Sequence, residues 1–116
     1  MDAIPRKIKK ALREYAGIAY EAELRIELQA LSAKFADWKS NQIDSFDLTE
    51  AIHQFHNGPA RDLYKKYNNA PLDLVMAHAI ATGLLNKDEI PAEMLEHLSA
   101  AIALYEEHQR QDRRDD

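Results

Sequence analysis

The chain contains no cysteine, only three glycines and four prolines, and no apolar run long enough to cross a bilayer. The lack of cysteine excludes disulfide bonds, thiolate nucleophiles and cysteine-ligated metal centres. Few glycines and prolines, beside abundant alanine, leucine, glutamate and lysine, are typical of helical proteins. We therefore expect a soluble, cytoplasmic, helix-rich protein.

The length of 116 residues is that of one domain with a single modest core. We predict one helical domain over residues 1–108, followed by a disordered polar tail over residues 109–116, which is too hydrophilic to repay the entropy of ordering. The formal net charge is −5, and an acidic domain is a poor nucleic-acid binder. Nucleic acid is thus an unlikely partner, and no membrane partner is expected.

No segment alternates in polarity as a strand does, so the fold class is all-α: a small bundle of about five helices. A long N-terminal helix is predicted from about Pro5 to Lys39, because this stretch has no internal proline. The remaining helices are expected at about 44–57, 59–67, 71–84 and 91–108. Asp44 caps the second of these, Asn57-Gly58 ends it, and Pro59 opens the third.

The long helix carries two apolar stripes that lie roughly 160° apart on a helical wheel. The first consists of Ile8, Leu12, Tyr15, Ala19, Ala22 and Ile26, and the second of Leu24, Leu28, Leu31, Phe35 and Trp38. A helix whose apolar face changes sides either breaks or needs two packing partners, and we favour the continuous helix. A second copy of the chain is the simplest source of the extra layer, so we predict a homodimer whose interface contains Leu28, Leu31, Phe35 and Trp38.

The second helix also has two unlike faces. Leu48, Ile52 and Phe55 fall together at 100° per residue and are expected to face the core. The opposite side carries an aromatic ring, a carboxylate and two imidazoles. With two residues of the next helix, these side chains form a predicted interaction surface of Phe46, Glu50, His53, His56, Arg61 and Tyr64.

Two other uses of this region stay open. Glu50, His53 and His56 are spaced three apart on one helix face, so they are candidate ligands for a zinc ion completed by a fourth ligand or water, in a metal-binding protein or hydrolase. Alternatively, the elements around Asn57-Gly58-Pro59 form a helix-turn-helix that contacts DNA, although nearby aspartates repel phosphate.

No motif names a reaction, since neither a glycine-rich phosphate loop nor a nucleophile elbow is present. We expect no cofactor and favour a role other than catalysis. The leading hypothesis is a small homodimeric protein-interaction or regulatory module with an unidentified protein partner.

Overall fold

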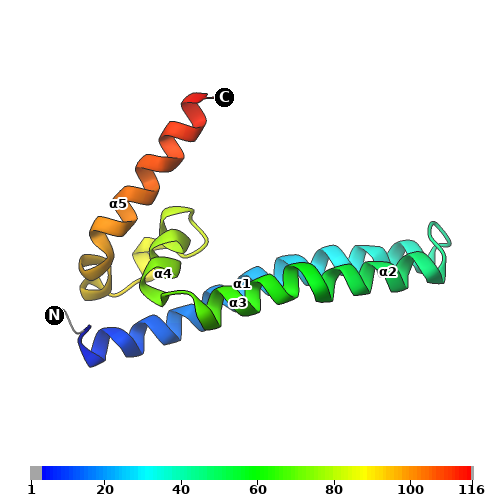
Figure 1. Cartoon of the computed structure of the whole chain (residues 1–116), viewed down its shortest axis with the longest axis horizontal. Helices are drawn as coiled ribbons and strands as arrows, with labels where there is room; N and C mark the ends of the chain where they lie inside the picture. Colours follow the sequence, from blue (N-terminus) through cyan, green and yellow to red (C-terminus); the bar gives the residue numbers. More distant parts are fainter. Residues whose placement is uncertain (1–3, 116) are drawn as a thin grey trace. The chain divides into compact units, whose positions relative to one another are not determined.

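The computed structural model describes residues 4–115, which are helical apart from short connections. In chain order the elements are α1 (Arg6–Lys39), α2 (Ser45–Phe55), the π-helical turn η1 (His56–Ala60), α3 (Arg61–Asn69), α4 (Leu72–Ala81), the 3₁₀ turn η2 (Lys87–Glu89) and α5 (Ala92–Asp115) (Figure 1). No strand occurs in these residues, so the prediction of an all-α fold is confirmed. Because α2, η1 and α3 follow one another without a gap, the described residues form four helical rods instead of about five.

The chain divides into two compact units. The first, which we call the core unit, consists of Met1–Ala19 and Ala70–Asp116, and the second, the hairpin unit, of Tyr20–Asn69. Helix α1 runs through both units, so the prediction of one domain over residues 1–108 stays a prediction. The first three of those residues lie outside the described part of the chain.

Helix α1 is continuous over 34 residues, as predicted from the sequence. Gly17 lies within it, and the cost of about 1 kcal/mol for a glycine in a helix is too small to break so long an element. Its first apolar stripe contributes Ile8, Leu12 and Ala19 to the core unit, where all three are buried.

The core unit combines the first part of α1 with α4, η2 and α5. Helix α4 is apolar on almost every side, and its Met76 is fully buried, as is Met94 of α5. Gly83, at a φ of 83°, ends this segment in a backbone conformation that side chains disfavour. Ion pairs of Lys7 with Glu93 and of Lys87 with Glu106 lie at the surface of the unit.

Helix α5 ends at Asp115, whereas the sequence pattern indicates an end near His108. Side-chain contacts between residues three or four apart support the additional turns: Arg110 Nη2 forms an ion pair with Glu107 Oε2 at 2.7 Å, and His108 Nε2 lies 3.9 Å from Asp112 Oδ2. Such pairs stabilise a helix by about 0.2–0.5 kcal/mol each. Of the predicted polar tail, Asp116 lies outside the described residues.

The hairpin unit is formed by the second part of α1 and the rod α2–η1–α3. Trp38 Nε1 donates a hydrogen bond to Ser45 Oγ over 3.0 Å near the turn, while Tyr67 bonds to Glu23 far from it, so the rods are antiparallel. Asn41, at a φ of 63°, lies in the turn. The predicted cap at Asp44 is confirmed: its Oδ1 accepts from the backbone N–H of Asp47, and its own N–H donates to Asp47 Oδ2.

The predicted break at Asn57-Gly58-Pro59 is wrong, because the chain passes through these residues as one π turn. Pro59 has no N–H, and its ring would crowd the carbonyl four residues back in an α-helix, which a wider turn avoids. The packing of the rod against α1 also favours a π turn, which contains one residue more than a turn of α-helix. Among the buried or half-buried residues of the rod, one series recurs about once a turn: Leu48, Ala51, Phe55, Pro59, Leu63 and Tyr67. Their spacing of about 3.8 residues per turn exceeds the 3.6 of an α-helix, so the π turn keeps both ends of the rod facing α1.

No helix among the described residues has the length and apolar character needed to span a membrane.

Candidate functional site

The six residues of the predicted interaction surface do not form one site. Phe46, Glu50 and His53 are exposed on α2, with Phe46 85% exposed, and Glu50 Oε1 accepts a hydrogen bond from Gln54 Nε2 over 3.3 Å. His56, Arg61 and Tyr64 instead border a groove between the two rods of the hairpin. The predicted surface is thus divided into an exposed part on α2 and a concave part beside α1, around η1 and α3.

The concave part is a groove of about 460 Å³, which we call the tyrosine groove. Its lining residues are Tyr20, Leu24, His56, Asn57, Ala60, Arg61 and Tyr64. The sequence analysis missed Tyr20, Leu24, Asn57 and Ala60. Leu24 heads the second apolar stripe and Tyr20 precedes it by one turn, which is the one signal that could have indicated the α1 wall.

The polar groups of the tyrosine groove carry positive charge or donate hydrogen bonds. Arg61 forms no ion pair with any described residue, and no aspartate or glutamate is among the residues that line the groove. Asn57 and the two tyrosines add amide and hydroxyl donors. The groove therefore differs from the acidic character of the chain as a whole, whose formal net charge is −5.

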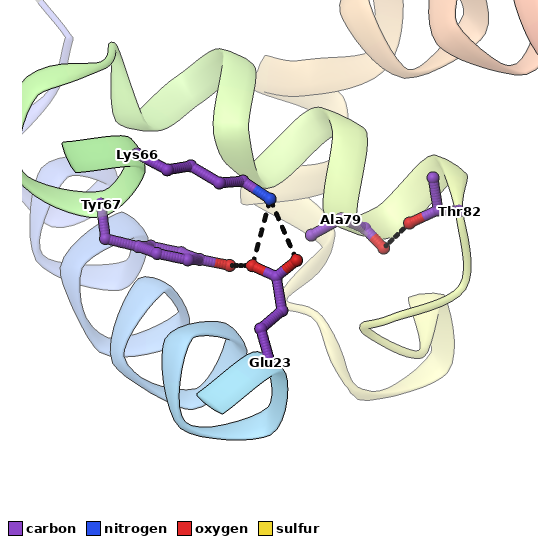
Figure 2. A network of polar contacts seen from close by, with 5 residues as sticks. All are labelled: Glu23, Lys66, Tyr67, Ala79 and Thr82. Carbon is purple, nitrogen blue, oxygen red and sulfur yellow. Dashed lines mark hydrogen bonds and ion pairs between the residues drawn. The ribbon is translucent and has the colours of Figure 1, made fainter. Parts of the chain in front are cut away.

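A network on α1 and α3 holds one wall of the groove in place. The rings of Tyr20 and Tyr67 are stacked, with centroids 4.7 Å apart and planes 5° from parallel. Figure 2 shows how Glu23 accepts hydrogen bonds from the Tyr67 hydroxyl, at 2.5 Å, and from Lys66 Nζ, at 3.1 Å. Tyr20 thus lies against a ring that is itself anchored to α1.

Burial raises the pKa of the Tyr67 phenol well above its ordinary value, and the hydrogen bond to the Glu23 carboxylate raises that pKa further. Both effects oppose loss of the phenolic proton, because phenolate would be desolvated beside a negative charge. Tyr67 is therefore a neutral donor that fixes Glu23, and it is unsuited to act as a base.

A second groove, of about 310 Å³, also lies within the hairpin. It is mainly apolar, and we call it the apolar groove. Its lining residues are Glu27, Ala30, Leu31, Lys34, Ala51, Gln54, Phe55 and Pro59.

The four residues of the predicted dimer interface have different surroundings. Leu31 is half-buried in the apolar groove, and Trp38 is bonded to Ser45 in the same chain. Leu28, Phe35 and Trp38 are 49%, 37% and 39% exposed, so the bond to Ser45 leaves much of the Trp38 side chain uncovered. Residues of α2 and η1 of the same chain therefore cover part of that stripe, and the homodimer stays a prediction.

The predicted metal ligands do not come together. In the part of the chain that the structure describes, no three histidine, aspartate or glutamate side chains gather closely enough to hold a metal ion. Glu50 and His53 lie on α2, and His56 belongs to the tyrosine groove. The arrangement gives no support to Glu50, His53 and His56 as a zinc site.

The helix-turn-helix alternative requires a turn between two helices, whereas α2, η1 and α3 form one rod. On α3, Lys66 is held by Glu23 and Arg61 borders the tyrosine groove, which leaves Lys65 as the remaining basic residue of that helix. A recognition helix presents a basic face to phosphate. This arrangement does not resemble one.

Comparison of the chain with protein-family models, with curated proteins and with solved structures finds no match.

Proposed function

We propose that this chain is a homodimeric helical interaction module in which the hairpin units of two copies pack together as a four-helix bundle. The observation that carries the proposal is the exposure of Leu28 and Phe35. Both belong to a stripe with the alternating spacing of four and three residues that is typical of helix-bundle seams. Half-exposed residues in such a stripe are suited to a further helix.

The stripe of α1 is divided between two directions. Leu31 and Trp38 face the rod α2–η1–α3 of their own chain. Leu28 and Phe35 are each turned by about 60° from the next member of the stripe, because three residues advance a helix by 300°. Leu31 and Trp38 can therefore pack within the hairpin while Leu28 and Phe35 contact a second copy of the chain.

Helix α2 contributes to the same side of the hairpin. Ile52 is 41% exposed and is turned by about 100° from Ala51, which lines the apolar groove. Leu28 is turned by the same angle from Glu27, which lines that groove on α1. We call Leu28, Phe35 and Ile52 the side patch.

A two-helix hairpin has too few layers to bury its apolar residues. In the hairpin unit, the large side chains that are buried are Leu48 and Tyr67. Bundles of four helices have an enclosed core between facing helices. Pairing two hairpins through the side patch would supply those layers by the closed twofold symmetry that is commonest among oligomers.

Sedimentation equilibrium of the full chain at micromolar concentration tests the proposal. We expect a dimer, and we expect the double substitution Leu28→Lys with Phe35→Lys to raise the dimer dissociation constant by about tenfold or more, since it places two charges in an apolar interface.

Ile26→Lys is the matched control, because Ile26 is also exposed but lies about 160° away from Leu28 on α1. We expect it to leave the dimer intact. A wild-type chain that is monomeric throughout, or an Ile26→Lys variant that dissociates equally, would overturn the proposal.

Phe46, Glu50 and His53 lie outside both the side patch and the tyrosine groove. Their exposure leaves them accessible on α2, and they stay the predicted contact surface for a second protein.

A further inference from the structure

We propose that the tyrosine groove binds a small molecule in which a flat ring carries an anionic group, either a carboxylate or a phosphate. This proposal is independent of dimerisation, because it depends on different residues. Its basis is the combination, in one concave site, of an unpaired positive charge at Arg61 and an aromatic wall at Tyr20 that is restrained by stacking on Tyr67.

The size of the groove fits such a ligand. At about 460 Å³ it lies in the range of small-molecule sites, which are mostly apolar with a few polar groups that fix orientation. Here Leu24, Ala60 and the tyrosine rings supply apolar surface, while Arg61, His56 and Asn57 supply polar groups. The polar groups belong to one rod and the Leu24 surface belongs to the other.

Arg61 determines the charge of the ligand. Its guanidinium carries a fork of donors that matches the two oxygens of a carboxylate or phosphate, and it forms no ion pair with any described residue. The carboxylate of Glu23 is already occupied by Lys66 and Tyr67. An anion in the groove would therefore find a free cationic partner without competition from Glu23.

The tyrosines determine the ring. Tyr20 is stacked on Tyr67, which restrains it as a flat wall, and Tyr64 also borders the groove from α3. Aromatic rings favour offset-stacked or edge-to-face partners. A planar ligand ring thus gains contact area with little ordering of Tyr20.

The π turn places the polar groups of the groove. His56 begins η1, Asn57 and Ala60 lie within it, and Arg61 follows it directly. Single π turns inside α-helices are rare and occur frequently at functional sites. In this chain the irregular turn and the unpaired donors coincide.

Isothermal titration calorimetry of the full chain tests the proposal with two probes, adenosine monophosphate and 2-naphthoate. Adenosine lacks the charge and inorganic phosphate lacks the ring, so both serve as ligand controls. We expect at least one probe to bind and both controls to bind at least about tenfold more weakly. Binding of adenosine monophosphate alone indicates a phosphate ligand, and binding of 2-naphthoate alone a carboxylate ligand.

Variants then assign the binding to the groove. We expect Arg61→Gln to lower the affinity for the probe by about ten- to a hundredfold. Arg13→Gln, the same change at an exposed residue of the core unit, should leave that affinity unchanged. Tyr64→Leu is expected to weaken binding, and Phe46→Ala on the same rod is not. Circular dichroism checks that each variant stays helical.

Failure of both probes to bind overturns the proposal, as does equal binding of adenosine or an Arg61→Gln variant with unchanged affinity. The side-patch variant Leu28→Lys with Phe35→Lys separates the two proposals. A monomeric variant that still binds the probe supports the groove, whatever the outcome for the dimer.

Discussion

The ring of Tyr67 is stacked on that of Tyr20, with 4.7 Å between the centroids, and its hydroxyl donates to Glu23 on the same helix as Tyr20. One side chain of α3 therefore makes two contacts with α1 that lie about one turn apart. Together with the bond from Trp38 to Ser45 at the other end, these contacts fasten both ends of the hairpin.

Replacing Tyr67 by phenylalanine keeps the stacked ring and removes the hydrogen bond to Glu23. We expect the free energy of unfolding to fall by about 1–2 kcal/mol, because the bond is made to a charged, partly buried acceptor. Tyr64→Phe is the control, since the Tyr64 side chain is exposed, and it should cost less than about 0.5 kcal/mol. Urea unfolding of the two variants measures the difference, and equal stabilities would contradict the anchoring role.

Alkaline pH provides a second test of the same residue. The raised pKa of Tyr67 means that its neutral phenol is favoured in the folded chain. Its contribution to stability is therefore fully present below the ordinary tyrosine pKa of about 10 and is lost as pH rises through the folded-state pKa. We expect the gap in unfolding free energy between wild type and Tyr67→Phe to narrow in strongly alkaline solution. A gap that widens in strongly alkaline solution would show that the pKa of Tyr67 is not raised by folding.

The different burial of two aliphatic residues of α2 predicts different losses of stability when each is replaced by alanine. Leu48 is 6% exposed, so Leu48→Ala should cost about 2–5 kcal/mol, as buried leucines do. Ile52, which the sequence pattern assigns to the core, is 41% exposed, and Ile52→Ala in a monomer should cost clearly less. Thermal melts of both variants at the lowest workable protein concentration compare them, and similar losses would place Ile52 back in the core.

Replacing His53 and His56 together by alanine should change stability by less than about 0.5 kcal/mol, because both side chains are exposed. The thermal melt of the double variant checks this expectation. A large loss would mean that one of the two imidazoles supports the hairpin.

The capping box of α2 gives a prediction about coupling. Asp44→Ala should destabilise the hairpin by about 1 kcal/mol, because the backbone N–H of Asp47 loses its acceptor. Asp47→Ala removes the reciprocal bond from the N–H of Asp44. The two losses should not add in the double variant, since the bonds form one motif. Additive losses in chemical unfolding would show that each aspartate acts alone.

Helix type and the start of α2 could be predicted from the sequence because both depend on neighbouring residues. The all-α class, the continuous α1 and the cap at Asp44 are of this kind. The apolar character of α4 likewise predicts its buried position, and Met76 is fully buried.

The π turn and the tyrosine groove could not be predicted in the same way. Pro59 and Gly58 are common at helix ends, and only the packing of Phe55 and Tyr67 against one α1 decides that the rod continues. The groove needs Tyr20 opposite Tyr64, which depends on the alignment of two antiparallel rods. No local pattern determines that alignment, so His56, Arg61 and Tyr64 could be named while their α1 partners could not.

The π turn makes the closure of the hairpin depend on how many residues lie between Phe55 and Tyr67. Loss of one residue from Asn57-Gly58 would leave every segment of the rod able to form a helix, but it would rotate α3 by about 100° relative to α2. The Tyr67 side chain would then point away from Tyr20 and Glu23, although no tyrosine had been replaced. A change of chain length that is harmless in most loops would here separate two helices, each of which stays intact.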